Sequence, residues 1–247
     1  MISQPIYGSD QLPALLLHQE VTLLALSDEK GTIETGSWYA YVAAGAVLAE
    51  LMRNDRVRIQ SKDEAKARGT LFNRNPKLLV TDPRPLGEEL ADEWLSKIRS
   101  SEKQRDVEHW LSAIANSKNL KERIADGLVE LGILQRVEDK VLWVFNRVRF
   151  PEVASAPETA IRQRLEAAIF EDSLNVEAGT VILLSLVKGG EFLPKLFDKK
   201  KLKNRKKHID RLIKGEQLGA ATAQLIESIQ VMIIAVAAAG AAAAASS

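Results

Sequence analysis

The stretch WYAYVAAGAVLAELM, residues 38–52, decides the fold class. Its apolar residues, among them Tyr39, Val42 and Leu51, recur at the spacing of one face of a helix. Small residues at positions 43–46 allow a neighbouring helix to approach closely. The stretch therefore predicts a helix that packs tightly against other helices.

More helices are predicted on both sides of this stretch. Residues 12–26, LPALLLHQEVTLLAL, are too apolar for a surface helix and predict a core helix that stops at the turn 27–31. Apolar residues at helical spacing predict further helices at 86–99, 107–114, 118–134, 160–174 and 218–245. Residues 176–187 form another strongly apolar segment, which ends at Gly189-Gly190.

Short strands complete the predicted fold. β-prone runs predict strands at 56–59 and 77–80, and a hairpin whose strands are 141–145 and 148–150. Aromatic residues make up only 5% of the chain, which favours packed helices over a β-sandwich. We therefore expect an all-α fold, a compact apolar helix bundle surrounded by amphipathic helices with short β-hairpins, as one domain over residues 1–247.

The composition argues against several functional classes. The 34 Lys and Arg balance the 33 Asp and Glu, and a net charge of +1 does not indicate a globally basic nucleic-acid binder. Cysteine is absent, and His18, His109 and His208 are far apart, so we expect no metal site. The common hydrolase, phosphate-loop, dinucleotide and zinc-protease motifs are missing, so we expect neither catalysis nor a cofactor. The first residues lack a basic segment followed by an apolar run, which predicts a cytoplasmic protein.

An ordered set of segments resembles the Golgi phosphoprotein 3 family, including its prokaryotic relatives. The segments are LLALSDEKG (23–31), LAEL (48–51) with DRVRI (55–59), LKER (120–123) leading to LVELGIL (128–134), FP (150–151) with IRQRL (161–165), and the apolar C-terminal helix. The resemblance implies an all-α peripheral membrane adaptor. Eukaryotic members recognise phosphatidylinositol 4-phosphate and help to retain membrane enzymes in vesicle traffic. The implied partners are an anionic phospholipid surface, client membrane proteins and a second copy of the chain, and not nucleic acid.

By resemblance, the family's headgroup pocket falls on Trp38, Lys118, Lys121 and Arg123. Trp38 stands a few residues later than the family's tryptophan, and Lys118 and Lys121 replace two arginines one helical turn apart. The family's helix arginine falls near Ala44 and is absent. Lysine keeps the point charge but loses bidentate phosphate geometry, so a generic anionic lipid is an alternative ligand to a phosphoinositide. A solvated basic face is the plainer interpretation of these lysines.

Two further regions are candidates for membrane contact. The family's hairpin contributes to self-association and membrane contact, which singles out Trp143 and Phe145; the alternative is that they pack against their own domain. The run 195–207 holds eight cations in thirteen residues. Such a run favours contact with an anionic leaflet or with nucleic-acid phosphates. The alternative is a solvent-exposed helix surface. The predicted basic patch of this run comprises Lys199, Lys200, Lys201, Lys203, Arg205, Lys206 and Lys207.

Other interpretations of the sequence remain open. Residues 225–245 are long enough to span a membrane, but the polar Glu227 and Gln230 and the many alanines favour a bundle helix. A helix at 118–134 followed by a hairpin is also the order of a winged-helix nucleic-acid module. A helical protein-binding adaptor without a lipid role is the third candidate.

Overall fold

The computed structural model describes residues 12–27, 31–33, 38–61, 63–64, 76–141, 145–216, 218 and 220–245. The helices are α1 Leu17–Ala25, α2 Trp38–Arg53, α4 Glu89–Ser100, α5 Val107–Ala115, α6 Leu120–Glu130, α7 Ala156–Phe170, α8 Ala178–Gly189, α9 Leu193–Leu196, α10 Lys199–Ile213 and α11 Ala220–Ala245. Antiparallel pairs join β1 Leu26–Ser27 to β2 Thr32–Ile33, β3 Val57–Ile59 to β4 Leu78–Val80, and β5 Val137–Val141 to β6 Phe145–Arg149. The predicted all-α class with short hairpins is confirmed.

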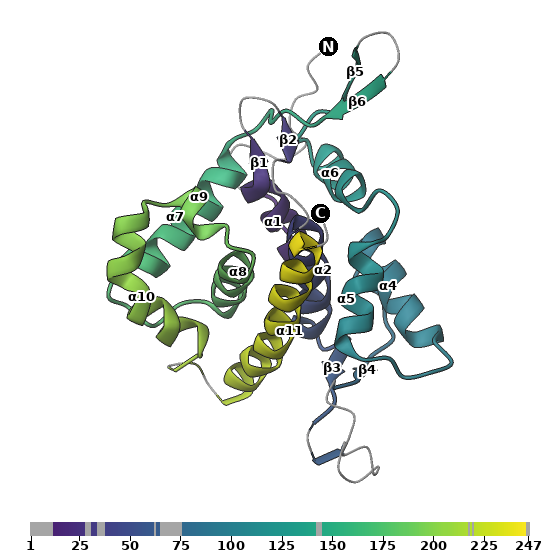
Figure 1. Cartoon of the computed structure of the whole chain (residues 1–247), viewed down its shortest axis with the longest axis vertical. Coiled ribbons are helices and arrows are strands. Elements are labelled where there is room, and N and C mark those ends of the chain that lie inside the picture. Colours follow the sequence, from purple (N-terminus) through teal and green to yellow (C-terminus); the bar gives the residue numbers. More distant parts are fainter. Residues whose placement is uncertain are drawn as a thin grey trace.

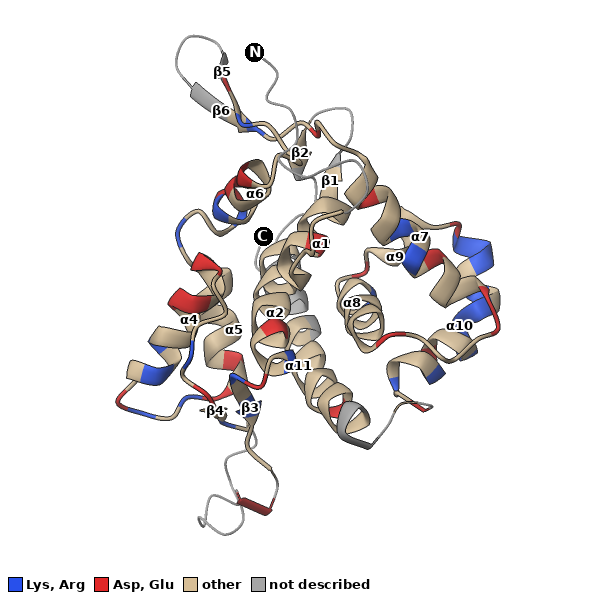
Figure 2. Ribbon diagram, turned by 180° about the vertical axis from the view of Figure 1, so that it is seen from behind, with Lys and Arg blue, Asp and Glu red and all other residues tan. Residues whose placement is uncertain are grey.

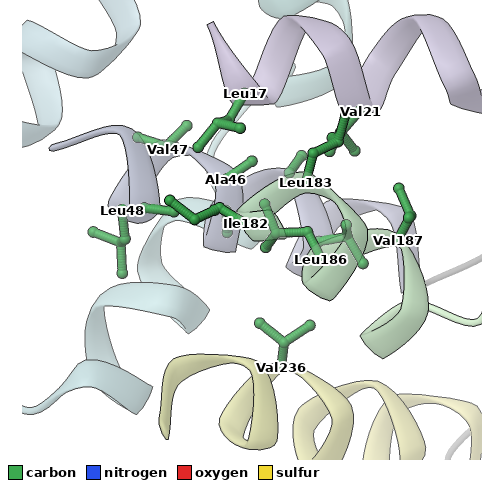
Figure 3. Close-up of a cluster of buried hydrophobic side chains, with 14 of the residues drawn as sticks. Leu17, Val21, Ala46, Val47, Leu48, Ile182, Leu183, Leu186, Val187 and Val236 are labelled. Atoms are coloured by element: carbon green, nitrogen blue, oxygen red, sulfur yellow. The ribbon is translucent and has the colours of Figure 1, made fainter. Parts of the chain in front are cut away.

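Helix α2 lies at the centre of the fold, in contact with α1, α5, α8 and α11 (Figure 1). Residues 42–52 are all buried, as expected for a helix enclosed by neighbours on every side. Residues 179–187 of α8 are likewise buried, and their aliphatic side chains meet those of α1 and α2 in one apolar cluster (Figure 3). Gly45 brings α2 close to α11, since an added Cβ would lie 3.1 Å from a methyl of Val236.

The remaining helices form two groups on opposite sides of this centre. Helices α4, α5 and α6 lie on one side, and α7, α9 and α10 on the other (Figure 1). Helix α10 packs against α7, α8 and α9, whereas α6 contacts α1. This arrangement places the start of α6 and the basic helix α10 far apart across the molecule.

A buried carboxylate locks the two N-terminal helices together. Glu50 of α2 is fully buried, and its Oε2 accepts a hydrogen bond from the Leu17 amide at 3.0 Å, at the first turn of α1. Its Oε1 accepts from Arg53 at 2.7 Å and from the Asn54 amide nitrogen at 2.8 Å. These hydrogen bonds stabilise the Glu50 carboxylate, whose burial without partners would be costly.

Gly31, just before β2, has a φ of +57°. Its carbonyl accepts from the Phe150 amide at 2.7 Å, and a Cβ at this position would lie 2.6 Å from the Pro151 nitrogen. Both the left-handed backbone and the close approach require glycine. Two segments that carry the family resemblance therefore touch here, although they are far apart in sequence.

Several predicted boundaries are wrong. The first helix begins at Leu17 rather than residue 12, and α7 runs over Ala156–Phe170 rather than 160–174. The described hairpin strands are Val137–Val141 and Phe145–Arg149 rather than 141–145 and 148–150, and residues 142–144 of the predicted first strand lie outside the described residues. The true first strand includes Glu138, Asp139 and Lys140, because a two-stranded hairpin does not require an apolar face.

The terminal helix α11 packs in the bundle, as predicted. Ile226, Ile229, Met232 and Val236 are buried, and α11 contacts α2, α5 and α8. Within the described chain, no helix has both the length and the apolarity to cross a membrane.

Candidate functional site

The start of α6 exposes the lysines predicted to meet a headgroup. Lys118 is exposed in the turn before the helix, and Lys121 is half-buried in its first turn. Asn119 between them has a left-handed backbone (φ 56°), and its side chain does not cap the helix. Neither ammonium forms an ion pair with any residue in the described ranges. An uncapped helix start flanked by two uncompensated cations is a geometry that favours an anion.

The start of α2 packs against α1. The Tyr39 hydroxyl is fully buried and 2.7 Å from the Thr22 hydroxyl. Desolvation raises the pKa of Tyr39 far above its ordinary value, and the negative charge of Glu122 in α6 adds to that rise. Glu122 is therefore close enough to affect this phenol. Trp38 is the first residue of α2, next to Tyr39, but its side chain lies outside the described part of the structure.

Arg123 differs from Lys118 and Lys121 because its charge is neutralised by ion pairs. Its guanidinium pairs with Glu93 of α4 and lies 3.5 Å from Glu89. Burial raises the pKa of Glu93, but hydrogen bonds from Lys97 and Arg123 outweigh that effect and lower the pKa overall. Arg123 thus fastens the first turn of α6 to α4, and its contribution at the start of α6 is positional.

The hairpin prediction for membrane contact remains open. Trp143 lies outside the described residues, and Phe145 is placed only as the first residue of β6, without its side chain. The described backbone pairs Val137 with Arg149 and Val141 with Phe145.

The predicted basic patch is divided among the faces of α10. Arg205 faces inward, where its Nε donates to the Ile169 carbonyl and its Nη1 to Asp172, both at 2.8 Å. The His208 ring contacts the Ala168 carbonyl at 3.0 Å, so these two residues fix α10 to the end of α7. The other members of the patch are exposed and make no ion pair with a described residue: Lys199, Lys200, Lys201, Lys203, Lys206 and Lys207. Figure 2 shows these cations along α10, on the far side of the core from α6.

An acidic pocket next to α6 was not predicted. Glu88, Glu89, Asp126 and Glu130 line a cavity of about 610 Å³ between α4 and α6, together with Arg123. His18 lies fully buried behind it, with its Nε2 3.6 Å from a Glu88 oxygen. These residues come from three helices, so no spacing in the sequence could have indicated the pocket. Among the described residues, no group of three or more such side chains could hold a metal ion.

Comparison with known proteins identifies the family. A sequence profile described as Golgi phosphoprotein 3 matches residues 17–229. The chain belongs to this family. It is similar to vacuolar protein sorting-associated protein 74 of Eremothecium gossypii, with 27% identity over 187 residues, covering 70% of this chain and 55% of that protein. The Schizosaccharomyces pombe protein of the same name is 28% identical over 180 residues, covering 68% of this chain and 52% of that protein. The chain thus spans about half the length of these relatives.

Proposed function

We propose that this Golgi phosphoprotein 3 family member is a peripheral membrane adaptor that binds anionic lipid headgroups, phosphatidylinositol 4-phosphate among them, at the start of α6. The observation that carries the proposal is the pair Lys118 and Lys121, which flank an uncapped helix start without ion-pair partners among the described residues. A phosphate there would meet two ammonium groups and the positive end of the helix dipole.

The expected strength of this contact is modest. Each lysine near an anionic leaflet contributes about 1 kcal/mol, so the two together give roughly 2 kcal/mol, or about thirtyfold in affinity. Without the family's helix arginine, which falls near Ala44, bidentate phosphate recognition is not available from this position. We therefore expect binding that depends on total negative charge more than on one headgroup, and that weakens steeply with salt.

The family assignment supports the adaptor role. The names of the two relatives associate them with vacuolar protein sorting. We propose that this chain likewise works without catalysis at the cytoplasmic surface of a membrane, where it holds client membrane proteins. Self-association of the chain is part of the same proposal.

Vesicle flotation tests the lipid site. The full chain should float with vesicles that contain phosphatidylserine or phosphatidylinositol 4-phosphate, and not with pure phosphatidylcholine. The double variant Lys118→Ala/Lys121→Ala should lose most of this binding. The matched variant Lys103→Ala/Lys214→Ala removes the same charge from exposed positions elsewhere and should bind like the wild type. Equal losses in both variants would show that α6 contains no specific site.

A winged-helix nucleic-acid module is the second candidate, because the hairpin β5–β6 follows α6 directly. A random DNA duplex in the same salt series separates the two functions. Binding of the duplex without binding of anionic vesicles would favour this candidate over the adaptor.

A further inference from the structure

A recessed groove runs along one face of α10. It has a volume of about 790 Å³ and lies between α10 and the segment that joins α8 to α9. Its floor is apolar and includes Leu193, Leu202 and Ile209. The lining of α10 reaches from Lys199 to Asp210, which corresponds to a length of about 16 Å, or three helical turns. We call this feature the α10 groove.

Lysines form both edges of the groove. Lys188 and Lys195 stand on the α8–α9 side, and Lys199, Lys203 and Lys206 stand on α10. The three α10 lysines are spaced by four and three residues, so they share one face of the helix. Their neighbours Lys200, Lys201 and Lys207 do not line the groove.

The charge of the groove is graded along its length. The acids Glu191 and Asp210 lie at the end near Lys188, and Asp210 is bound to Lys188 at 2.7 Å. At the other end, Lys199 and Lys203 of α10 make no ion pair with a described residue. The groove therefore attracts negative charge most strongly at the start of α10.

Both sides of the groove are held in place by the fold. Arg205 and His208 fix α10 to the end of α7, and the Lys188–Asp210 ion pair links α8 to α10. Leu193 and Ile209 are nearly buried, while Leu202 keeps part of its surface exposed at the groove floor. A site formed in advance lowers the entropic cost of binding.

We infer that the α10 groove docks an acidic amphipathic helix of a partner protein. A bilayer surface would meet the exposed lysines at the edges, whereas side chains that project from a helix can enter between them toward Leu202. A helix with apolar residues three and four positions apart fills such a floor, and acidic residues on its flanks meet the lysines on both sides. Three turns of helix match the length of the groove. This inference does not depend on the lipid site, because the α10 groove and the start of α6 lie on opposite sides of the core (Figure 2).

Fluorescence anisotropy with a designed probe tests the inference. The probe is a labelled two-heptad peptide with leucine at the a and d positions and glutamate elsewhere. The full chain should bind it, and a peptide with lysine in place of glutamate should not bind. The groove variant Lys199→Glu/Lys203→Glu/Lys206→Glu should bind the acidic probe at least about tenfold more weakly. The matched variant Lys200→Glu/Lys201→Glu/Lys207→Glu carries the same charge change on the same helix and should stay within about twofold of the wild type.

A milder variant guards against loss of folding. Leu202→Gln keeps every lysine but places a polar group on the groove floor, and it should weaken binding while the circular dichroism spectrum stays unchanged. Failure of the wild type to bind the acidic probe would overturn the inference. Equal weakening of probe binding in the two triple variants would also overturn the inference. That result would show that the overall charge of α10, rather than the groove, attracts the probe. If the groove triple abolishes vesicle flotation and leaves peptide binding intact, the face is a membrane surface instead.

Discussion

The start of α6 and helix α10 both display lysines that no described carboxylate neutralises, yet their surroundings differ. At α6, the exposed Lys118 and the half-buried Lys121 flank an uncapped helix end. At α10, Lys199, Lys203 and Lys206 stand beside an apolar floor. A pair of cations at a helix end suits a single anionic headgroup, whereas cations around an apolar groove suit a folded amphipathic segment.

This difference shows that a cluster of lysines does not by itself identify the molecule that binds there. The two regions have the same residue type and lie on opposite sides of the core (Figure 2). What separates them is whether apolar surface lies within reach of the charges. An adaptor needs two such surfaces, one for the membrane and one for a protein, and this arrangement leaves each accessible while the other is occupied.

The largest expected effect removes the support that both surfaces share. Glu50→Ala removes the buried acceptor of the Leu17 amide and of the more exposed side chains of Arg53 and Asn54. The Leu17 amide left without its acceptor costs about 1–3 kcal/mol, and the cavity left by the shortened buried side chain adds to that loss. Urea denaturation should show that loss, together with weaker binding of both vesicles and acidic probe. The exposed Glu166→Ala is the control and should leave stability within about 0.5 kcal/mol.

An intermediate effect should separate the two regions. Arg205→Ala removes the donor to the Ile169 carbonyl and releases α10 from the end of α7. An unsatisfied buried acceptor costs about 1–3 kcal/mol, and the groove should lose its fixed geometry. We expect weaker binding of the acidic probe and unchanged flotation with anionic vesicles. Loss of both activities to the same degree would contradict the separation.

The smallest effect is expected for the ion pair between Glu93 and Arg123, which links α4 to α6. The lowered pKa of Glu93 means that the folded protein keeps this carboxylate ionised below the ordinary value of 4.5. Its stabilising contribution is therefore complete above that pH and is lost as the pH falls through the lower, folded-state pKa. Glu93→Gln should cost at most about 1 kcal/mol at pH 7, since the pair is partly exposed.

The pH series supplies the control for that prediction. Urea denaturation of the wild type and of Glu93→Gln should give curves that converge once the pH is well below 4.5. A gap in stability that stays constant across the series would show that Glu93 acts through packing rather than through its charge.

Sequence patterns predicted the centre of this fold because burial there is nearly complete. Residues 42–52 and 179–187 are apolar almost without interruption, and the structure encloses both. The hairpin failed for the opposite reason. Its strands carry charged residues such as Glu138 and Arg149, whereas apolar patterning predicts the first strand at 141–145. The spacing of apolar residues does not predict an element that does not pack against the core.

The candidate sites were predictable only in part. The spacing of Lys118 and Lys121 predicted one helical turn, but Lys118 lies before the helix and Asn119 between them has a left-handed backbone; their headgroup role comes from the family resemblance and stays a prediction. The pairing of Arg123 with Glu93 could not be foreseen, because thirty residues separate them and only the packing of α4 on α6 joins them. The α10 groove had a sequence signal in Lys199, Leu202, Lys203, Lys206 and Ile209, which share a helical face. Its other side comes from the α8–α9 segment, which only the tertiary structure places there.

Recruitment of the acidic probe to vesicles by the full chain tests the central claim most directly, because it requires both surfaces at once. The labelled peptide should float with anionic vesicles only when the protein is present. Lys118→Ala/Lys121→Ala should abolish this recruitment while the chain still binds the peptide in solution. The groove triple should abolish it while the chain still floats. If vesicles and peptide instead compete for the protein, a single basic surface serves both and the account of two separate sites is wrong.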